Sequence, residues 1–343
     1  MHQLLNTLYV TTEGAYLHLD HDTLKVKIEK ETKLQVPIHH LGGIVCFGNV
    51  MVSPAAMARC AEDGRFLVLL DRNGRFKARV EGPVSGNVLL RSAQHEAMRD
   101  EMKTLDIAKN MVAGKIQNSR QIVLRGARES TDDDDSQTLK KTTDKLASTL
   151  SRLPKCQNID QVRGIEGEAA RAYFSSFDRM VREDRETFKF NGRNRRPPRD
   201  PINALISFLY ALLMNDCVAG AEGVGLDPQM GFLHTIRPGR AALALDLMEE
   251  VRSVLADRLA LTLINRRQIQ KRHFIDRPGG AVHLDDKGRK EVVIAYQKRK
   301  QEEITHPLLN QKMPLGLIPH VQARLLARTL RGDMENYIPY LYR

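Results

Sequence analysis

The segment RFLVLLDRNGRFKARVEGPVSGNVLLRSAQHEAMRDEMKTL, residues 65–105, contains the change of pattern that decides the fold. It begins with two apolar runs on either side of Asn73 and Gly74, a pair that is a strong signal for a β-hairpin. The stretch 81–86 holds glycine and proline and is typical of a linker. After it, apolar residues recur at a spacing close to 3.6, which predicts α-helices. The segment therefore divides the chain into a β part and a helical part.

The residues before this segment are predicted to form strands. Short runs with alternating apolar residues cover 4–10, 14–19 and 24–30, and turn signals separate them. A short helix is expected after Ser53, its N-cap, and Gly64 is expected to stop it. The sequence therefore predicts a small β-sandwich with one helix.

The residues after the segment are predicted to be mainly α-helical. Two stretches break the helical pattern: 191–201 is a basic, proline-rich loop, and 281–296 is expected to be a hairpin made of AVHL and EVVIAY. The four acids 132–135 are expected to form a solvated loop tip rather than a cation site. The predicted fold class is α+β, with an N-terminal β-sandwich domain (1–80), a linker (81–86) and a mainly α-helical catalytic domain (87–343).

The charge balance indicates a polyanionic partner. The chain of 343 residues has a formal net charge of +11, of which +2 falls in residues 1–80 and +9 in the rest. A basic excess in one part of a chain favours binding to nucleic acid, although an ordinary basic protein remains the alternative. Tryptophan is absent and aromatic residues make up 5%, which argues against base stacking as the main mode of binding.

Cysteine usage and apolar runs indicate the cellular setting. The four cysteines contain no CxxC pair, which argues against a zinc ribbon and a disulfide framework. The first residues lack the pattern of a signal peptide. No apolar run is expected to reach the roughly 18 residues that a membrane span needs. We expect a cytoplasmic protein without a membrane partner.

The segment GIEGEAARAYFSSF, residues 164–177, contains a candidate site residue. On a helix, Tyr173 and Phe177 belong to an apolar stripe that Glu166 shares, whereas Glu168 faces the other side. A carboxylate on an apolar face requires a partner or a bound cation. The alternative places Glu166 in a frayed first turn, where the helix dipole favours an acid.

A second segment, MGFLHTIRPGRAALALDLMEEVRSVLADRL at 230–259, predicts a helix that begins near Ala241. Asp246, Glu249 and Glu250 are spaced so that their carboxylates are neighbours. They form either a solvated acidic face or a cluster that a metal or an arginine neutralises.

Two further residues near this helix bear on that choice. Arg252 follows Glu249 by three positions and is a candidate partner for the acids. His234 precedes the helix, and a lone histidine in such a place is commonly structural. A histidine with carboxylates nevertheless suits a divalent cation that assists phosphodiester chemistry, and Mn²⁺ accepts imidazole more readily than Mg²⁺ does.

Three segments together resemble the signatures of the CRISPR-associated "Cas one" integrases, in the same order and separation. They are GIEGEAARAYF (164–174), DPINALISFLYALL (200–213) and GFLHTIRPGRAALALDLMEEVR (231–252). The middle segment places Asn203, Ser207 and Tyr210 in helical register, as in that family. The resemblance covers essentially the whole chain and looks closest to the subtype I-C branch.

The resemblance implies a divalent-metal-dependent DNA endonuclease and integrase, which inserts prespacer DNA into a CRISPR array during spacer acquisition for antiviral defence. It implies Glu166, His234 and Asp246 as ligands of Mg²⁺ or Mn²⁺, and Glu249 as a further catalytic acid, with Glu250 left open in its place. It also implies a homodimer formed largely through the N-terminal domains and a small "Cas two" partner protein.

Contacts to DNA phosphates are assigned to basic side chains of the helical domain, because cations that neutralise phosphates supply most of the affinity for DNA. The candidates are Arg193, Arg195, Arg196, Arg252, Arg266 and Arg267. Two other classes of function stay open: a basic scaffold that binds nucleic acid without catalysis, and a hydrolase of small phosphate esters. Metal-dependent cleavage of DNA excludes the first, and salt-dependent binding of DNA argues against the second.

Overall fold

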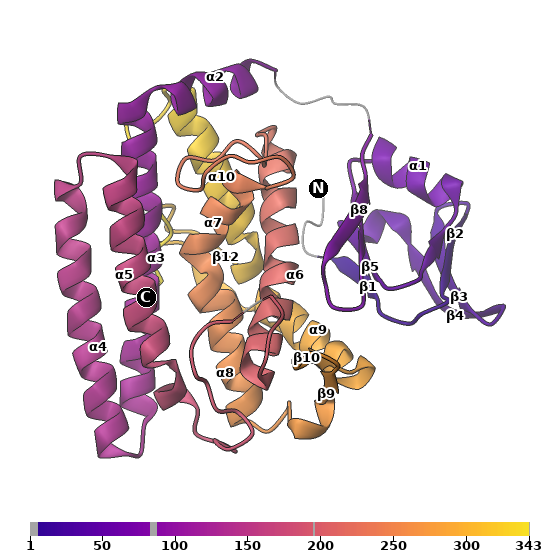
Figure 1. The fold of residues 1–343 in the computed structure, drawn as a ribbon. Helices are drawn as coiled ribbons and strands as arrows, with labels where there is room; N and C mark the ends of the chain where they lie inside the picture. Colours follow the sequence, from indigo (N-terminus) through magenta and orange to yellow (C-terminus); the bar gives the residue numbers. More distant parts are fainter. Residues whose placement is uncertain (1–5, 83–87, 195, 343) are drawn as a thin grey trace. The chain divides into compact units, whose positions relative to one another are not determined.

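The computed structural model describes residues 6–82, 88–194 and 196–342. The chain divides into two compact units, residues 1–85 and 86–343 (Figure 1). Part of the expected linker at 81–86 and Arg195 lie outside the described residues.

In its described residues, 6–82, the first unit contains two four-stranded sheets, one α-helix and a short 3-10 helix (Ile38–His40). Its elements are β1 (Thr7–Val10), β2 (Tyr16–Asp20), β3 (Thr23–Ile28), β4 (Glu31–Pro37), β5 (Gly43–Phe47), β6 (Met51–Val52), α1 (Pro54–Glu62), β7 (Phe66–Leu70) and β8 (Phe76–Val80). One sheet has the order β1-β5-β7-β8 and the other β4-β3-β2-β6. Parallel pairs occur in both sheets, between β1, β5 and β7 in the first and between β2 and β6 in the second.

The core of this unit lies between the two sheets. Leu17 and Leu24 of one sheet and Ile44 and Leu67 of the other are fully buried in a single cluster, which also contains Cys60 of α1. Apolar side chains from both sheets therefore share one interior, as in a β-sandwich. The predicted fold class of this part is confirmed.

The predicted helix and hairpin of the unit are confirmed as well. The Ser53 hydroxyl accepts a hydrogen bond from the Ala56 amide at 3.2 Å, which caps α1. Strands β7 and β8 pair in an antiparallel manner across the predicted turn. Gly74 has a φ of 81° in that turn, a conformation that glycine adopts without steric cost.

The second unit is mainly α-helical, as predicted. Its elements are α2 (Val88–Arg99), α3 (Glu101–Glu129), α4 (Asp133–Arg152), α5 (Ile159–Ser175), α6 (Pro201–Val224), α7 (Ala242–Arg252), a π-helical segment (Ser253–Asp257), α8 (Arg258–Asn265), β9 (Phe274–Arg277), β10 (Ala281–Leu284), α9 (Asp286–Gln301), β11 (Glu303–Thr305), β12 (Lys312–Pro314) and α10 (Ile318–Leu330). The long helix α3 packs against α4, α5 and α7, and α6 packs against α7 and α10 (Figure 1).

The hairpin expected at 281–296 is wrong in its second half. AVHL forms β10, but its antiparallel partner is β9, which precedes it in the chain. EVVIAY belongs to α9, because the Asp285 carboxylate accepts a hydrogen bond from the Gly288 amide at 2.6 Å and caps that helix. Val292, Val293 and Tyr296 are buried at helical spacing. The polar stretch before them therefore starts a helix and is not a turn.

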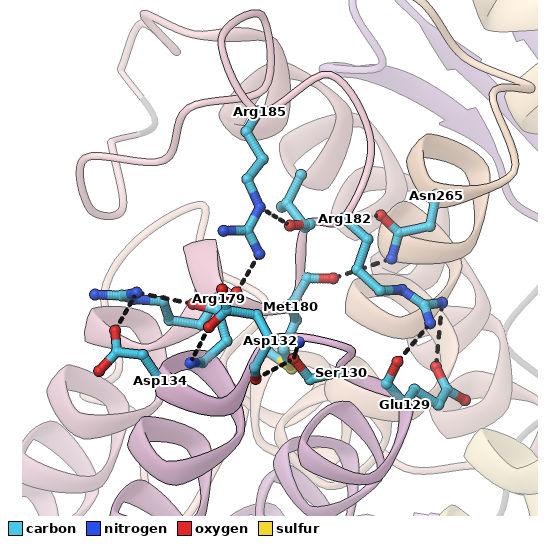
Figure 2. A network of polar contacts seen from close by, with 11 residues as sticks. Glu129, Ser130, Asp132, Asp134, Arg179, Met180, Arg182, Arg185 and Asn265 are labelled. Atoms are coloured by element: carbon cyan, nitrogen blue, oxygen red, sulfur yellow. Dashed lines mark hydrogen bonds and ion pairs between the residues drawn. The ribbon is translucent and has the colours of Figure 1, made fainter.

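The expectation of a solvated loop tip at 132–135 is right for the exposed Asp132, Asp133 and Asp134, but wrong for Asp135 and for the loop, because these residues start helix α4. Asp132 caps α4, and Asp135 in its first turn is fully buried between the guanidinium groups of Arg179 and Arg185. Figure 2 shows these arginines converging on the start of α4. Burial acts to raise the pKa of Asp135, but the two arginines outweigh it and hold the pKa below its ordinary value. The buried Asp135 is therefore neutralised by arginines of the protein itself.

Helix α6 corrects a further expectation. It is long and apolar enough to cross a membrane by length and composition, with a mean hydropathy of 1.6 in its most apolar window. Leu205, Leu209 and Leu213 on this helix are fully buried, and it packs against α7 and α10. This packing is that of a core helix.

Residues 340–342 dock on the helical unit through one asparagine of α3. The Asn118 amide nitrogen donates a hydrogen bond to the Tyr340 carbonyl at 2.8 Å. The Asn118 amide oxygen accepts a hydrogen bond from the Tyr342 amide at 2.7 Å. Because Asn118 is fully buried, these bonds satisfy polar groups that would be costly to leave unpaired.

Candidate functional site

Glu166 lies well inside helix α5. The helix begins at Ile159, where the Asn158 side chain caps it, so Glu166 is more than a full turn from the N-terminus. Its side chain is 26% exposed and forms an ion pair with Lys115 of α3. The structure therefore excludes the alternative that places Glu166 in a frayed first turn.

The predicted phase of α5 is confirmed. Tyr173 and Phe177 are buried on the apolar face of the segment, and Glu166 turns toward the interior helix α3. Glu168 instead forms an ion pair with Arg152 of α4. The two glutamates therefore have different partners on different helices.

Four hydrogen bonds reach the Asp246 carboxylate, and two of them come from His234. His234 Nδ1 lies 2.6 Å from Oδ1, and the His234 amide donates to the same oxygen at 3.0 Å. The amides of Phe232 and Leu233 donate to Oδ2 at 2.6 and 3.0 Å. An ionised carboxylate has about four sites for hydrogen-bond donors. The fully buried Asp246 therefore has all of its acceptor capacity in use.

This arrangement requires glycine at position 231. A Cβ atom built on Gly231 would lie 2.6 Å from Asp246 Oδ2 and equally close to the backbone of Ala242. Such a distance is well inside van der Waals contact, so a side chain would displace the carboxylate or the turn. The GFLH sequence thus lets the chain pass directly over the start of α7.

Glu249 lies on α7 among three nitrogen groups. Its Oε1 is 2.9 Å from Arg252 Nη1 and 3.9 Å from His234 Nε2, and its Oε2 is 2.6 Å from Lys115 Nζ. Burial acts to raise the pKa of Glu249, but the charges of Arg252 and Lys115 outweigh it, and the pKa is lowered to about 2. Glu249 is therefore an ionised carboxylate inside the protein.

Glu250, its neighbour in sequence, points elsewhere. Its Oε1 accepts a hydrogen bond from the Tyr337 hydroxyl at 2.5 Å. Its Oε2 accepts from Gln322 Nε2 at 3.0 Å and from the Tyr340 amide at 2.9 Å. Burial raises the pKa of Glu250 to about 8. The choice that the sequence left open falls on Glu249, because Glu249 and not Glu250 lies beside His234.

The residues expected to bind a metal are linked by ion pairs, but their donor atoms do not all lie close together. Within the described part of the chain, the set of three donor side chains whose ligand atoms lie within 4.8 Å of one another is Asp132, Asp134 and Asp135, on α4. Neither Glu166, His234 and Asp246 nor Glu166, His234 and Glu249 form such a set among the described residues. The Lys115 ammonium instead joins Glu166 to Glu249, and His234 joins Glu249 to Asp246.

The donor atoms near His234 Nε2 fit a hard divalent cation. Ligand atoms held about 2.0–2.3 Å from Mg²⁺ or Mn²⁺ lie roughly 3–4.5 Å apart. The separation of 3.9 Å between His234 Nε2 and Glu249 Oε1 falls in this range. Two carboxylates and one imidazole are also a ligand set that Mn²⁺ accepts.

The middle signature segment positions basic groups rather than metal ligands. Arg193 donates hydrogen bonds to Asn203 Oδ1 at 2.7 Å and to Ser207 Oγ at 3.0 Å, both on α6. The guanidinium groups of Arg193 and Arg252 lie 5.4 and 5.5 Å from the ring centroid of Tyr210. Both arginines therefore have protein partners, which differs from the expected role as phosphate contacts.

The remaining basic candidates differ in exposure. Arg196 and Arg266 are exposed, as phosphate contacts must be. Arg267 is exposed too, but it forms an ion pair with Glu183 at 2.6 Å. Arg195 lies outside the described residues.

Lys115 is a residue of the site that the sequence patterns did not reveal. Its ammonium is the group that connects Glu166 to Glu249, and its side chain is only 4% exposed. The signal was present in α3, where Met111 and Ser119, one turn before and one turn after Lys115, are both buried. A lysine on the buried face of an amphipathic helix requires an acidic partner.

Comparisons with known proteins agree with this architecture. A model of the family described as CRISPR associated protein Cas1 matches residues 8–298. The CRISPR-associated endonuclease Cas1 1 of Moorella thermoacetica is 63% identical over 343 residues, which is 100% of each chain. The structure of a casposase bound to integration product matches with a TM-score of 0.83 and 22% identity, over 97% of this chain and 92% of the other. A Cas6-RT-Cas1–Cas2 complex matches with a TM-score of 0.84 and 23% identity, over 99% of this chain and 36% of the other.

Proposed function

Because the chain belongs to the Cas1 family, we propose that it is a metal-dependent DNA endonuclease and integrase of CRISPR spacer acquisition. In this reaction the 3′-hydroxyl of a prespacer attacks a phosphodiester at the border of a repeat. A phosphorus–oxygen bond forms to the incoming 3′-oxygen as the bond to the leaving 3′-oxygen breaks. Hydrolytic cleavage is the same exchange with water as the nucleophile.

The observation that carries this proposal is the junction of side chains around His234. The Glu249 carboxylate of α7 lies beside its imidazole, and the Lys115 ammonium of α3 pairs both with Glu249 and with Glu166 of α5. Glu166, His234 and Glu249 come from two of the three signature segments and are separated by up to 83 positions in the sequence, and Lys115 lies outside those segments. A scaffold that only binds nucleic acid has no need for such a buried ionic site.

We propose Glu166, His234 and Glu249 as the residues that hold Mg²⁺ or Mn²⁺. The ion would stabilise the negative charge that develops on the phosphate. This set differs from the one implied by the resemblance, because Asp246 has no acceptor site left for an ion. Asp246 instead holds the His234 ring so that Nε2 faces Glu249, which is the usual task of a carboxylate behind a metal-binding histidine.

The partners in this proposal are DNA, a second copy of the chain and a small Cas2 protein. Support for DNA comes from the casposase bound to its integration product, and support for Cas2 from the Cas1–Cas2 complex, which share this fold. The exposed Arg196 and Arg266 are the proposed phosphate contacts. We further propose a homodimer through the first unit, a cytoplasmic location and a place in the subtype I-C branch, the last on its signature segments.

The proposal is tested by strand transfer. A labelled prespacer, a supercoiled plasmid with one repeat, the Cas2 partner and the purified protein are combined with Mn²⁺ or with a chelator. Integration is expected with Mn²⁺ and not with the chelator. Binding of DNA without any cleavage or integration under all metal conditions would show a scaffold instead.

A further inference from the structure

We propose that Lys115 is the internal counter-ion of the candidate metal site: its ammonium holds Glu166 and Glu249 together and competes with a divalent cation for the same two carboxylates. This inference rests on the proposed function, because it takes the metal site as given. It assigns a positioning role to a residue of α3, which contributes none of the expected ligands.

The contacts of Lys115 carry the inference. The residue reaches Glu166 on α5 and Glu249 on α7, two of the helices that pack against its own helix. The Lys115 ammonium lies 2.6 Å from Glu249 Oε2, and it also forms an ion pair with Glu166 Oε1. The Lys115 and Glu249 side chains are only 4% and 5% exposed, so water contributes little to neutralising Glu249, whereas Glu166 is 26% exposed.

The charges of the junction explain why the lysine matters. Glu166, Glu249 and Asp246 supply three negative charges, and Lys115 and Arg252 supply two positive ones. With the imidazole neutral, as a metal ligand must be, the site keeps one net negative charge. It is therefore nearly balanced before any ion binds. A divalent cation would bring the sum to one positive charge, which a DNA phosphate balances.

Competition follows from this arrangement. Buried carboxylates without a counter-ion are costly, so Lys115 stabilises the metal-free protein. A cation bound to Glu166 and Glu249 would lie close to the ammonium, and like charges at such a distance repel. Lys115 thus favours the metal-free state over the metal-bound state and weakens the affinity for the metal.

Lys115→Met tests this, since methionine fills a similar volume without the charge. The matched control is Lys103→Met, which removes an exposed charge from the same helix. Calorimetric titration with MnCl₂ and thermal unfolding are compared for both variants and the parent. Lys115→Met is expected to unfold at a lower temperature without Mn²⁺ and to bind Mn²⁺ more tightly, on the order of tenfold. Its unfolding temperature should rise with Mn²⁺ by more than that of the parent.

An affinity of Lys115→Met for Mn²⁺ equal to or weaker than that of the parent overturns the inference while leaving the metal site intact. If Lys115→Met folds only with Mn²⁺ present, the inference is supported, because the metal then replaces the lost charge. Failure to fold even at saturating Mn²⁺ contradicts it. A parent protein that binds no Mn²⁺ overturns the metal site itself and so separates the two proposals.

Discussion

His234 Nδ1 lies 2.6 Å from Asp246 Oδ1, and this contact determines which ring nitrogen faces Glu249. A carboxylate at Nδ1 keeps the proton on that nitrogen, so the lone pair of Nε2 is directed toward Glu249, 3.9 Å away. The histidine is therefore presented to the site in one tautomer and one orientation.

Replacing Asp246 should accordingly weaken the site without removing a ligand. Asp246→Asn is expected to reduce the affinity for Mn²⁺ by about 10–100-fold, because an amide cannot fix the tautomer in the same way. Glu249→Gln should reduce it more, since a proposed ligand is lost. Calorimetric titration with Mn²⁺ compares the two variants. A larger loss for Asp246→Asn than for Glu249→Gln would make Asp246 the ligand, as the family resemblance implied.

The two glutamates of α5 provide a matched pair for catalysis. Glu166→Ala should abolish integration and cleavage while DNA binding persists, because affinity for DNA comes from distributed phosphate contacts. Glu168→Ala should leave activity unchanged, since Glu168 pairs with Arg152 on α4. Strand transfer and filter binding measure the two properties separately. The opposite pattern would mean that the wrong face of α5 was assigned to the site.

The candidate arginines Arg193, Arg196 and Arg266 should separate into a structural group and a phosphate-binding group. Arg193→Ala removes hydrogen bonds to Asn203 and Ser207, so it should cost about 1–3 kcal/mol of stability and leave the salt dependence of DNA binding unchanged. Arg196→Ala and Arg266→Ala remove exposed charges and should each lower the salt slope by about one. Affinity measured at several salt concentrations decides this. An unchanged slope for both exposed variants would place the DNA elsewhere.

Stability in acid should depend on Glu129 at the end of α3 (Figure 2). Burial acts to raise the pKa of Glu129, but Arg258 and Arg125 outweigh it and lower the pKa to about 2. A carboxyl whose pKa is lowered by folding stabilises the fold at any pH above its pKa in the unfolded chain, which is near 4.5. This stabilisation disappears as the pH falls toward 2, the pKa in the folded protein.

At pH 7 the free energy of unfolding of Glu129→Gln should therefore be lower than that of the parent by on the order of 1–3 kcal/mol. This difference in free energy should shrink as the pH falls below about 4.5. Chemical unfolding at pH 7 and pH 3 measures this difference. Asp160→Asn is the control, because Asp160 is 86% exposed in its pair with Arg163 and such pairs contribute little. A Glu129→Gln deficit that stays constant with pH would show that packing, and not charge, is responsible.

Local patterns were enough to predict much of this architecture. The Asn-Gly turn, the Ser53 cap and the change from alternation to a 3.6 period are properties of neighbouring residues, and each was found in place. The helical phase of α5 likewise separated Glu166 from Glu168, because side-chain direction on a helix follows from spacing alone.

Pairings between distant residues could not be predicted in this way. Lys115 and Glu166 are 51 positions apart, and the direction of Glu250 depends on Tyr337, 87 positions later. Asp135 stands in a run of four acids, which is typical of an exposed segment. It is nevertheless buried, because Arg179 and Arg185 both pair with it. In each case tertiary packing decided between a solvated charge and a paired one.

The bonds of Asn118 also have a consequence for the order in which the polypeptide matures on the ribosome. The amide side chain of Asn118 waits for a partner that is synthesised 224 residues later. Glu250, which is buried beside Asn118, accepts a hydrogen bond from the Tyr340 amide, which is synthesised 90 residues after Glu250. A nascent chain therefore lacks the Tyr340 and Tyr342 partners of these two groups while the sandwich unit is already complete and free to fold. The last hydrogen bonds of Asn118 and Glu250 form only after residues 340–342 have been translated.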